Sequence, residues 1–144
     1  MNDNPIKVLL VDDDEDDYIL IRDWLNEFQL GSCELEWLDN YQIAKDVIAS
    51  RRHNIYLLDY RLGAENGLEL LKSSIESGLT SPIILLTGRG DRDIDIEAME
   101  AGAADYLEKT QLNAPLLERS IRYALGRKQT EQKIIEQAAL LDVA

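Results

Sequence analysis

Short, mostly apolar runs that end abruptly at a polar residue are the feature of this sequence that most restricts its fold. Such runs lie at 6–11, 55–58 and 82–86, with a shorter one at 105–107. Runs of this length are typical of strands that are buried in a parallel sheet. Helical patterns separate them, so the order is strand then helix, about five times. This order predicts an α/β fold with helices on both faces of a parallel sheet.

The segments between the runs carry helix and strand signals of their own. Asp14 is placed to cap the first helix, whose first turn is acidic. Residues 34–38 alternate polar and apolar, as in an edge strand. The expected helices cover 16–29, 41–50, the stretch after Gly67, 91–101 and the chain from Ala114 onward.

The last of these helices is expected to leave the domain. Between Leu116 and Ala139 there is no proline and one glycine, and residues 127–133 are almost wholly polar. So polar a stretch is too exposed to belong to a core, which favours a helix that reaches a partner or another domain. The expected organisation is a domain over residues 5–125 and a helical extension or linker over residues 126–144.

The chain is strongly acidic, with 28 acids against 15 bases and a net charge of -13. Such a surface repels phosphates, so direct contact with nucleic acid is not expected. No apolar run is long enough to cross a bilayer, and the N-terminus lacks the pattern of a secretion signal. A single cysteine, Cys33, fits a reducing compartment. Together these features predict a cytoplasmic protein without a membrane partner.

The polar residues at the ends of the apolar runs form the candidate site. Asp12 and Asp13 follow the first run, and Asp59, Thr87 and Lys109 end or follow three later ones. Ligands of an open parallel sheet bind beyond the carboxyl ends of its strands, so these side chains should meet at one edge. Three carboxylates there repel one another and need a cation. Oxygen ligands select a hard ion such as Mg²⁺.

This set of side chains matches the needs of phosphoryl transfer. Asp59 is placed to act as a nucleophile toward phosphorus. The metal and Lys109 would offset the charge of the phosphoryl oxygens, and Thr87 would donate a hydrogen bond to them. The sequence therefore predicts an acidic pocket that accepts a phosphoryl group on Asp59.

Taken together, these segments resemble the receiver domain of response regulators in two-component signalling. The matching segments are 8–13, 57–62, 66–71, 84–88 and 98–109. The resemblance implies a flavodoxin-like, doubly wound (βα)5 sandwich over residues 5–125, with parallel sheet order 2-1-3-4-5 and an extended C-terminal helix. It also implies a regulatory phosphoprotein of a phosphorelay, whose only chemistry is its own phosphorylation and dephosphorylation.

The resemblance assigns a metal-binding role to four positions. Asp12, Asp13 and Asp59 would bind Mg²⁺ through their side chains, and Arg61 would bind it through its backbone carbonyl. Asp59 would also be the phosphoacceptor.

The resemblance implies that Thr87 and Lys109 would hold the phosphoryl oxygens. Tyr106 would be the aromatic switch residue that swings inward when Thr87 moves, although from the residues alone it fits a core aromatic equally well. Thr110 departs from the pattern, because the family usually has a proline there after a cis peptide bond. The geometry of the Lys109–Thr110 bond therefore stays open.

The implied phosphodonor is a phosphohistidine on a histidine kinase or a histidine phosphotransfer protein. A homodimer, a downstream domain reached through the C-terminal helix, and an origin in a longer multidomain sensor or hybrid kinase all stay open.

Two alternative functions also stay open. A magnesium-dependent phosphatase of the haloacid-dehalogenase type would use an aspartate nucleophile, but it carries a second aspartate two residues later, where this chain has Arg61. An unphosphorylated pseudo-receiver, acting only as a docking module, would not require the complete acidic, threonine and lysine set.

The remaining polar clusters are expected to be structural. The acids at 14–17 are interpreted as the solvated start of a helix. His53, the single histidine, lies in a polar turn with Arg51 and Arg52 and is expected at the surface, without a partner for metal or acid–base work.

Overall fold

A parallel sheet forms the centre of the structure, a computed structural model that describes residues 4–29, 31–88 and 92–142. Its strands are Ile6–Val11 (β1), Cys33–Leu38 (β2), Ile55–Asp59 (β3), Ile83–Thr87 (β6) and Asp105–Glu108 (β7). The five strands lie in the order β2-β1-β3-β6-β7, and every pairing between them is parallel. This is the predicted 2-1-3-4-5 order, with a short hairpin inserted between the third and fourth strands.

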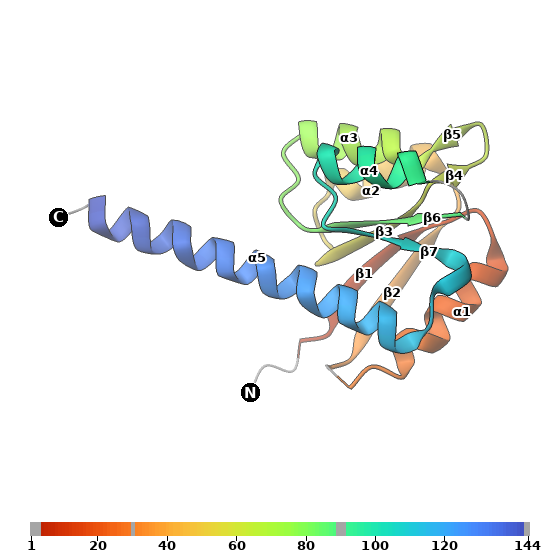
Figure 1. Cartoon of the computed structure of the whole chain (residues 1–144), viewed down its shortest axis with the longest axis horizontal. Helices are drawn as coiled ribbons and strands as arrows, with labels where there is room; N and C mark the ends of the chain where they lie inside the picture. The colour runs from red at the N-terminus through yellow and green to blue at the C-terminus, as the bar shows by residue number, and fades with distance from the viewer. Residues whose placement is uncertain (1–3, 30, 89–91, 143–144) are drawn as a thin grey trace.

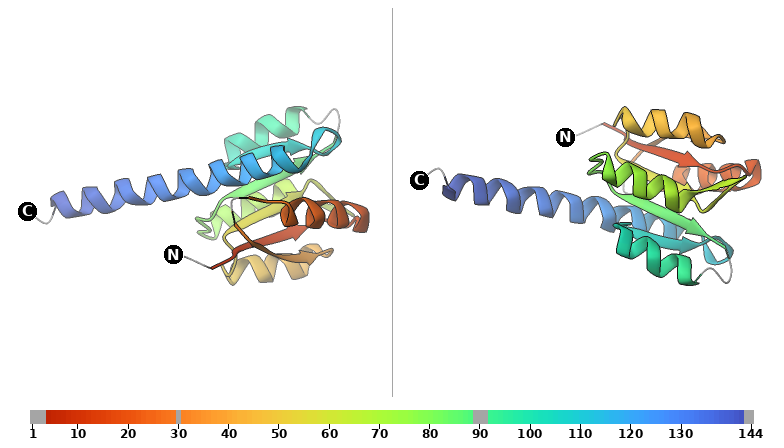
Figure 2. Two further views of the ribbon diagram at one scale, coloured as in Figure 1. Left: turned by 90° about the horizontal axis from the view of Figure 1, so that it is seen from below. Right: turned by 90° about the horizontal axis from the view of Figure 1, so that it is seen from above.

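Helices cover both faces of this sheet, as predicted. They are Glu15–Asn26 (α1), Tyr41–Ala49 (α2), Gly67–Glu76 (α3), Arg92–Ala101 (α4) and Ala114–Asp142 (α5). Helices α2, α3 and α4 lie on one face, and α1 and α5 lie on the other (Figures 1 and 2). The expected start of the fourth helix at Asp91 lies outside the described residues. Helix α1 ends at Asn26, before the predicted end at Gln29.

Each face of the sheet has an apolar core of its own, because successive side chains along a strand point to opposite faces. Leu9 and Leu58 pack toward α2, α3 and α4, whereas Leu10 and Leu57 pack toward α1 and α5. Strands β1, β3 and β6 are therefore covered on both sides. This explains why their sequences are continuous apolar runs and do not alternate.

Short polar side chains cap the helices that begin near the carboxyl ends of the strands. The side chain of Asp14 accepts a hydrogen bond of 2.8 Å from the backbone N–H of Asp16, which confirms the predicted cap of α1. Asn40 and Asn66 cap α2 and α3 in the same way. Such caps satisfy backbone donors that the helix itself leaves unpaired, and so define where each helix starts.

An antiparallel hairpin between β3 and α3 was not expected from the sequence. It consists of Arg61–Leu62 (β4) and Glu65–Asn66 (β5). Gly63, in the turn, has a φ of +65°, which glycine adopts without a steric penalty. The sequence indicated only a loop here, because two strands of two residues each are too short to show a period.

Helix α5 continues well beyond the sheet (Figure 1). Leu117, Ile121 and Ala124 are buried against the sheet, whereas Ile134 and Ile135 are 61% and 62% exposed. The far end of the helix projects beyond the amino ends of the strands, opposite to the candidate site (Figures 1 and 2). The proposed domain boundary after residue 125 stays a prediction. Among the described residues, no helix combines the length and apolarity needed to cross a membrane.

Candidate functional site

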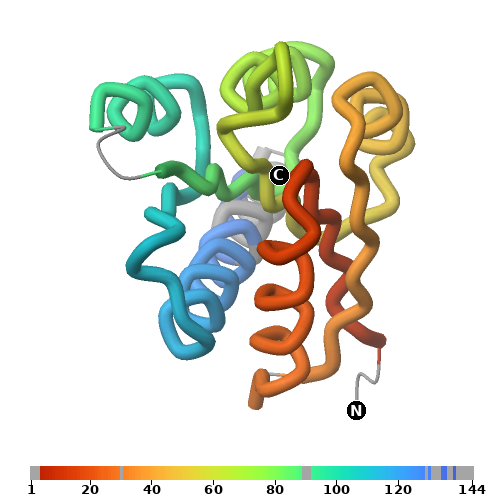
Figure 3. Tube along the Cα trace, turned by 90° about the vertical axis from the view of Figure 1, so that its right-hand side faces the viewer, coloured from red at the N-terminus to blue at the C-terminus, as the bar shows by residue number. Residues whose placement is uncertain are grey.

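Four of the predicted site residues lie at the carboxyl end of the sheet, the end that faces the viewer in Figure 3. Asp12 follows β1, Asp59 and Thr87 end β3 and β6, and Lys109 follows β7. The Nζ atom of Lys109 lies 3.1 Å from Oδ2 of Asp12 and 2.9 Å from Oδ2 of Asp59. Both carboxylates are almost completely buried. The parallel topology thus brings together side chains that are far apart in the sequence.

A third carboxylate, that of Asp17, belongs to the same group. Its Oδ2 lies 2.5 Å from Nζ of Lys109. One carboxylate oxygen from each of Asp12, Asp17 and Asp59 lies within 4.8 Å of the others. We call these three acids and Lys109 the acidic cluster.

The interpretation of Asp17 as part of a solvated helix start is wrong. Its side chain is only 24% exposed, because it lies against the ammonium group of Lys109. The short spacing between Asp12 and the helix cap at Asp14 is the sequence signal that could have indicated this, since it leaves little room for α1 to start elsewhere.

Asp13 and Arg61 lie at the side of the acidic cluster that faces the hairpin. Asp13 is exposed, and its Oδ2 accepts a hydrogen bond of 3.1 Å from the backbone N–H of Gly63. The backbone N–H of Arg61 donates a long hydrogen bond of 3.4 Å to Oδ1 of Asp59. The hairpin is therefore attached to both acids, and it holds the backbone of Arg61 next to Asp59.

The Lys109–Thr110 peptide bond is trans, as are all peptide bonds within the described part of the chain. Lys109 begins a short 3₁₀ turn, Lys109–Gln111 (η1), directly after β7. Its ammonium group nevertheless reaches the three acids. The departure at Thr110 thus does not keep Lys109 away from Asp12 and Asp59.

Thr87 has a buried hydroxyl group that neither donates nor accepts a hydrogen bond among the described residues. Thr87 is 0% exposed, on the strand that pairs with β3. Burying a hydroxyl group without a partner costs free energy, so such a group is usually hydrogen-bonded. The hydroxyl of Thr87 is therefore available to a group that binds beside Asp59.

Tyr106 lies on the edge strand β7 and is 42% exposed, which excludes its alternative interpretation as a core aromatic. It lines a surface groove between α4, β7 and α5, together with Gly88 and Arg92. Its side chain is in the outward position in this structure.

Burial controls the electrostatics of the acidic cluster. It raises the pKa of Asp12 to about 7, although a hydrogen bond from the N–H of Asp14 and the charge of Lys109 oppose the shift. Burial also raises the pKa of Asp59, again against the effect of Lys109. Burial by itself lowers the pKa of Lys109, but its hydrogen bonds to Asp17 and Asp59 outweigh this effect, so the pKa is raised. Lys109 therefore stays a cation.

These donors suit a hard divalent cation better than a soft one, because they are carboxylate oxygens. Asp12 Oδ2 is buried and accepts no well-aligned hydrogen bond, although the ammonium group of Lys109 lies 3.1 Å away. One ammonium group faces three carboxylates, which leaves negative charge in excess. The residues present thus fit a bound cation.

Gly67 allows α3 to begin against the backbone of Asp59. A Cβ atom at Gly67 would lie 2.2 Å from the carbonyl oxygen of Asp59. The N–H of Gly67 also donates a hydrogen bond of 2.8 Å to the carbonyl of Tyr60. A larger residue would push β3 and α3 apart.

His53 does not lie on the surface, so that prediction is wrong. It is 8% exposed, its Nε2 lies 2.7 Å from Oε1 of Glu36 on β2, and its ring contacts Tyr56 edge-on at 5.6 Å. Glu36 lies 17 positions earlier in the sequence, so the polar residues around His53 could not indicate this contact.

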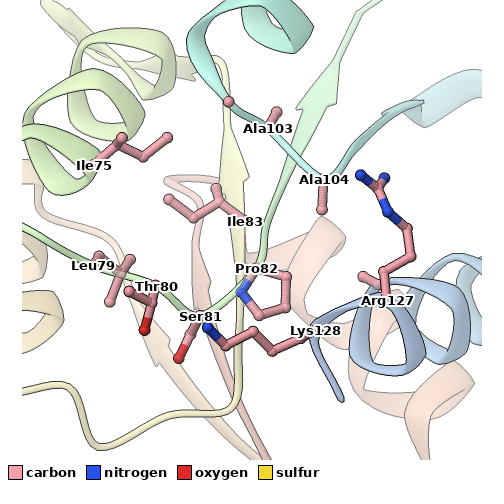
Figure 4. Close-up of a pocket in the computed structure, with 12 residues that line it drawn as sticks. Ile75, Leu79, Thr80, Ser81, Pro82, Ile83, Ala103, Ala104, Arg127 and Lys128 are labelled. Atoms are coloured by element: carbon pink, nitrogen blue, oxygen red, sulfur yellow. The ribbon is translucent and has the colours of Figure 1, made fainter. Parts of the chain in front are cut away.

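A separate cavity of about 220 Å³ lies at the opposite end of the sheet (Figure 4). It lies between the end of α3, the start of β6, the loop before β7 and α5, and Arg127 and Lys128 flank it. None of the predicted site residues lines this cavity. It is therefore not part of the site at the acidic cluster.

Known proteins share this fold and this sequence pattern. A family model described as response regulator receiver domain matches residues 8–121. The chain belongs to this family of receiver domains. A crystal structure of a response regulator receiver domain protein from Clostridium thermocellum has a TM-score of 0.75 and 26% sequence identity, and covers 87% of this chain and 98% of that one.

Curated relatives from Pseudomonas aeruginosa are longer than this chain. The C4-dicarboxylate transport transcriptional regulatory protein DctD is 32% identical over 123 residues, which cover 85% of this chain and 26% of DctD. The phosphate regulon transcriptional regulatory protein PhoB is 35% identical over 106 residues, which cover 72% of this chain and 45% of PhoB. The chain therefore matches from about a quarter to less than half of these relatives' lengths.

Proposed function

We propose that this chain is a phosphoacceptor switch of a two-component phosphorelay, in which Asp59 accepts a phosphoryl group. One observation carries the proposal. Asp59 is 4% exposed and shares the ammonium group of Lys109 with Asp12, while the buried hydroxyl of Thr87, on the next strand, has no hydrogen-bond partner among the described residues. A nucleophile (Asp59), a cation (Lys109) and a hydrogen-bond donor (the hydroxyl of Thr87) thus lie at the same end of the sheet.

The transfer step needs little covalent chemistry from the protein. A carboxylate oxygen of Asp59 forms a bond to phosphorus as the phosphorus–nitrogen bond of a phosphohistidine breaks. The leaving imidazole nitrogen keeps the electron pair and takes up a proton from water. Lys109 and Thr87 are placed to hold phosphoryl oxygens, so catalysis comes from positioning and from offsetting charge.

The proposed cofactor is Mg²⁺, held by Asp12, Asp13, Asp59 and the backbone carbonyl of Arg61. When bound, it supplies positive charge that offsets the carboxylates and the phosphoryl oxygens. The chain's own residues prepare this site: the hairpin fixes Asp13 and Arg61, and burial keeps Asp12 and Asp59 dry.

Switching would follow from the buried hydroxyl of Thr87. A phosphoryl group on Asp59 accepts a hydrogen bond from this hydroxyl, which draws the end of β6 toward Asp59. The space that this opens lets Tyr106 turn inward from its exposed position. The face formed by α4, β7 and α5 then changes shape, as a two-state shift in population.

The proposed phosphodonor is a histidine kinase or a histidine phosphotransfer protein in the cytoplasm. Two relatives are named transcriptional regulatory proteins. The output is therefore proposed to reach a downstream domain, or a second copy, through the exposed length of α5. The acidic domain itself, over residues 5–125, is not proposed to contact nucleic acid or a membrane.

The test uses a small phosphodonor, phosphoramidate, and intact-mass measurement of the folded protein in Mg²⁺. We expect one phosphoryl adduct on the wild type, none on Asp59→Asn, and an unchanged adduct on Asp46→Asn, a control at an exposed carboxylate on α2. Labelling that survives Asp59→Asn would contradict the proposal. Steady release of phosphate from a generic phosphate ester would support the phosphatase alternative.

The docking-module alternative makes a different prediction. A pseudo-receiver would remain folded but show no change in amide NMR shifts with Mg²⁺ followed by beryllofluoride, a mimic of the phosphoryl group. A response that requires Mg²⁺ and disappears in Asp59→Asn would exclude this alternative.

A further inference from the structure

We infer that Asp17 is a positioning residue that holds the ammonium group of Lys109 in place when Asp12 and Asp59 take up their metal and phosphoryl group. The inference rests on the proposed function, and it adds a residue for which that function assigns no role. Asp17 was not among the predicted site residues.

The contacts of Lys109 lead to this inference. An ammonium group has three N–H donors, and three carboxylate oxygens surround this one. The contact with Asp17 is the shortest, at 2.5 Å, against 2.9 Å for Asp59 and 3.1 Å for Asp12. Lys109 is therefore shared among all three acids.

The three acids have different roles in the proposed function. Asp12 and Asp59 are the acids that the proposed function assigns to the metal and the phosphoryl group. A cation between them repels the ammonium group and competes for their oxygens. Asp17 lies on helix α1 and is not one of the proposed metal ligands. Its contact with the ammonium group of Lys109 can therefore persist when Asp12 and Asp59 bind the metal and the phosphoryl group instead.

The surroundings of the Asp17–Lys109 pair favour a strong contact. Both side chains are about one-quarter exposed. The pair lines a small cavity of about 30 Å³ whose other walls are Leu20, Ile21, Trp24 and Leu112. Apolar walls exclude water from one side of the pair, and a lower local dielectric constant strengthens its attraction.

A helix-dipole role does not account for Asp17. Glu15 and Asp16 lie in the same first turn and are exposed, and the structure shows no ion pair between Asp16 and a described residue. They would serve the dipole as well as Asp17 does. Asp16→Asn is therefore a matched control, because it removes the same charge one residue away and leaves Lys109 untouched.

The experiment follows the side-chain ammonium of Lys109 by NMR of lysine-labelled protein, with the signal assigned by its loss in Lys109→Arg. In the wild type and in Asp16→Asn we expect the ammonium protons to be protected from exchange, both without a metal and in saturating Mg²⁺. In Asp17→Asn we expect this protection to be lost in Mg²⁺, and Asp17→Glu should restore part of it.

A kinetic measurement separates positioning from metal binding. In Asp17→Asn the maximal rate of phosphorylation by phosphoramidate should fall roughly tenfold, as expected from loss of one charge-assisted hydrogen bond. In Asp17→Asn the half-saturating Mg²⁺ concentration should stay within about twofold of the wild-type value. Asp13→Asn should raise this concentration more, because the loss of a ligand weakens metal binding.

Two results would overturn the inference. In one, Asp17→Asn behaves like Asp16→Asn in both measurements, so that Asp17 is an ordinary first-turn acid. In the other, Asp17→Asn raises the half-saturating Mg²⁺ concentration as much as Asp13→Asn does, so that Asp17 is a metal ligand. If the wild type accepts no phosphoryl group, the proposed function fails, but ammonium exchange with and without Mg²⁺ still decides whether Asp17 holds Lys109.

Discussion

The indole N–H of Trp37 donates a hydrogen bond of 2.7 Å to the backbone carbonyl of Asp12. Trp37 lies on β2, and its ring stacks on that of Tyr18 in α1, with 4.5 Å between ring centroids and 9° between ring planes. The first acid of the site is thus connected to the edge strand and to the helix that carries Asp17. Any ligand that moves Asp12 should also change the environment of this indole ring.

Trp37 should therefore report on the acidic cluster. We expect Mg²⁺, and then beryllofluoride, to change the tryptophan fluorescence of the wild type. The change should be kept in Trp24→Phe and lost in Trp37→Phe, which retains a stacked ring but loses the hydrogen bond. Trp37→Phe should also lower the free energy of unfolding by about 1 kcal/mol. A metal response that depends on Trp24 alone would contradict this assignment.

Gly67→Ala should damage both the fold and the site. The new Cβ would lie 2.2 Å from the backbone oxygen of Asp59, which cannot move independently of its strand. We expect a loss of about 1–3 kcal/mol in urea unfolding, as for overpacking of a core, together with slower phosphorylation. Gly126→Ala is the matched control, since its Cβ position in α5 lies more than 4 Å from every described atom outside the adjoining residues and the backbone of that helix. It should stabilise the helix by up to about 1 kcal/mol and leave phosphorylation unchanged.

Thr87→Val should separate stability from switching. Valine has nearly the same shape and replaces a buried hydroxyl that makes no hydrogen bond with the described residues. Because no bond is lost and a polar group leaves the interior, the free energy of unfolding should stay level or rise by about 1 kcal/mol. The NMR response of Tyr106 to beryllofluoride should nevertheless disappear. A large loss of stability would show that the hydroxyl has a structural partner.

The stability of the metal-free protein should fall as the pH rises from about 4 to about 7. Burial raises the pKa of Asp12 from 3.8 to about 7, so the folded state binds a proton in this window that the unfolded state has released. The stabilisation is present below the lower pKa and lost above the higher one, with a slope of up to about 1.4 kcal/mol per pH unit.

The measurement is urea unfolding in a chelator at several pH values, taken as the difference between the wild type and Asp12→Asn. That difference removes the contributions of groups remote from the acidic cluster. Mg²⁺ needs deprotonated carboxylates, so it should stabilise the wild type more at pH 8 than at pH 6. A difference that rises with pH in the chelator would show that Asp12 is ionised throughout this range.

The sheet could be predicted because its signal is local. Each of β1, β3 and β6 is a mostly apolar run that is covered on both faces, and each ends at a polar residue or directly before one. The cap at Asp14 is also local, since it joins that side chain to the N–H of Asp16. The meeting of Asp12, Asp59 and Lys109 followed from the rule for parallel strands, without any knowledge of distances.

The failures concern residues whose partners are distant in the sequence. Asp17 resembled its exposed neighbours, but it lies against Lys109, 92 positions later. His53 follows two arginines in the sequence, but it is buried against Glu36. Neither contact leaves a periodic pattern. A polar side chain can be solvated or paired with the same sequence around it, and only packing distinguishes the two.

The sequence by itself determined the five strands of the parallel sheet and the helices between them, because burial on two faces leaves continuous apolar runs. It also placed Asp12, Asp59, Thr87 and Lys109 at one edge, because the carboxyl ends of parallel strands meet there. Only the tertiary structure decided how the charges are shared. It placed Lys109 among Asp12, Asp17 and Asp59, whereas the three acids predicted for the site were Asp12, Asp13 and Asp59. It also left the hydroxyl of Thr87 unpaired within the described residues, and turned Tyr106 outward. Those outcomes depend on distances of a few ångströms between separate elements, and electrostatic attraction and burial act at that scale.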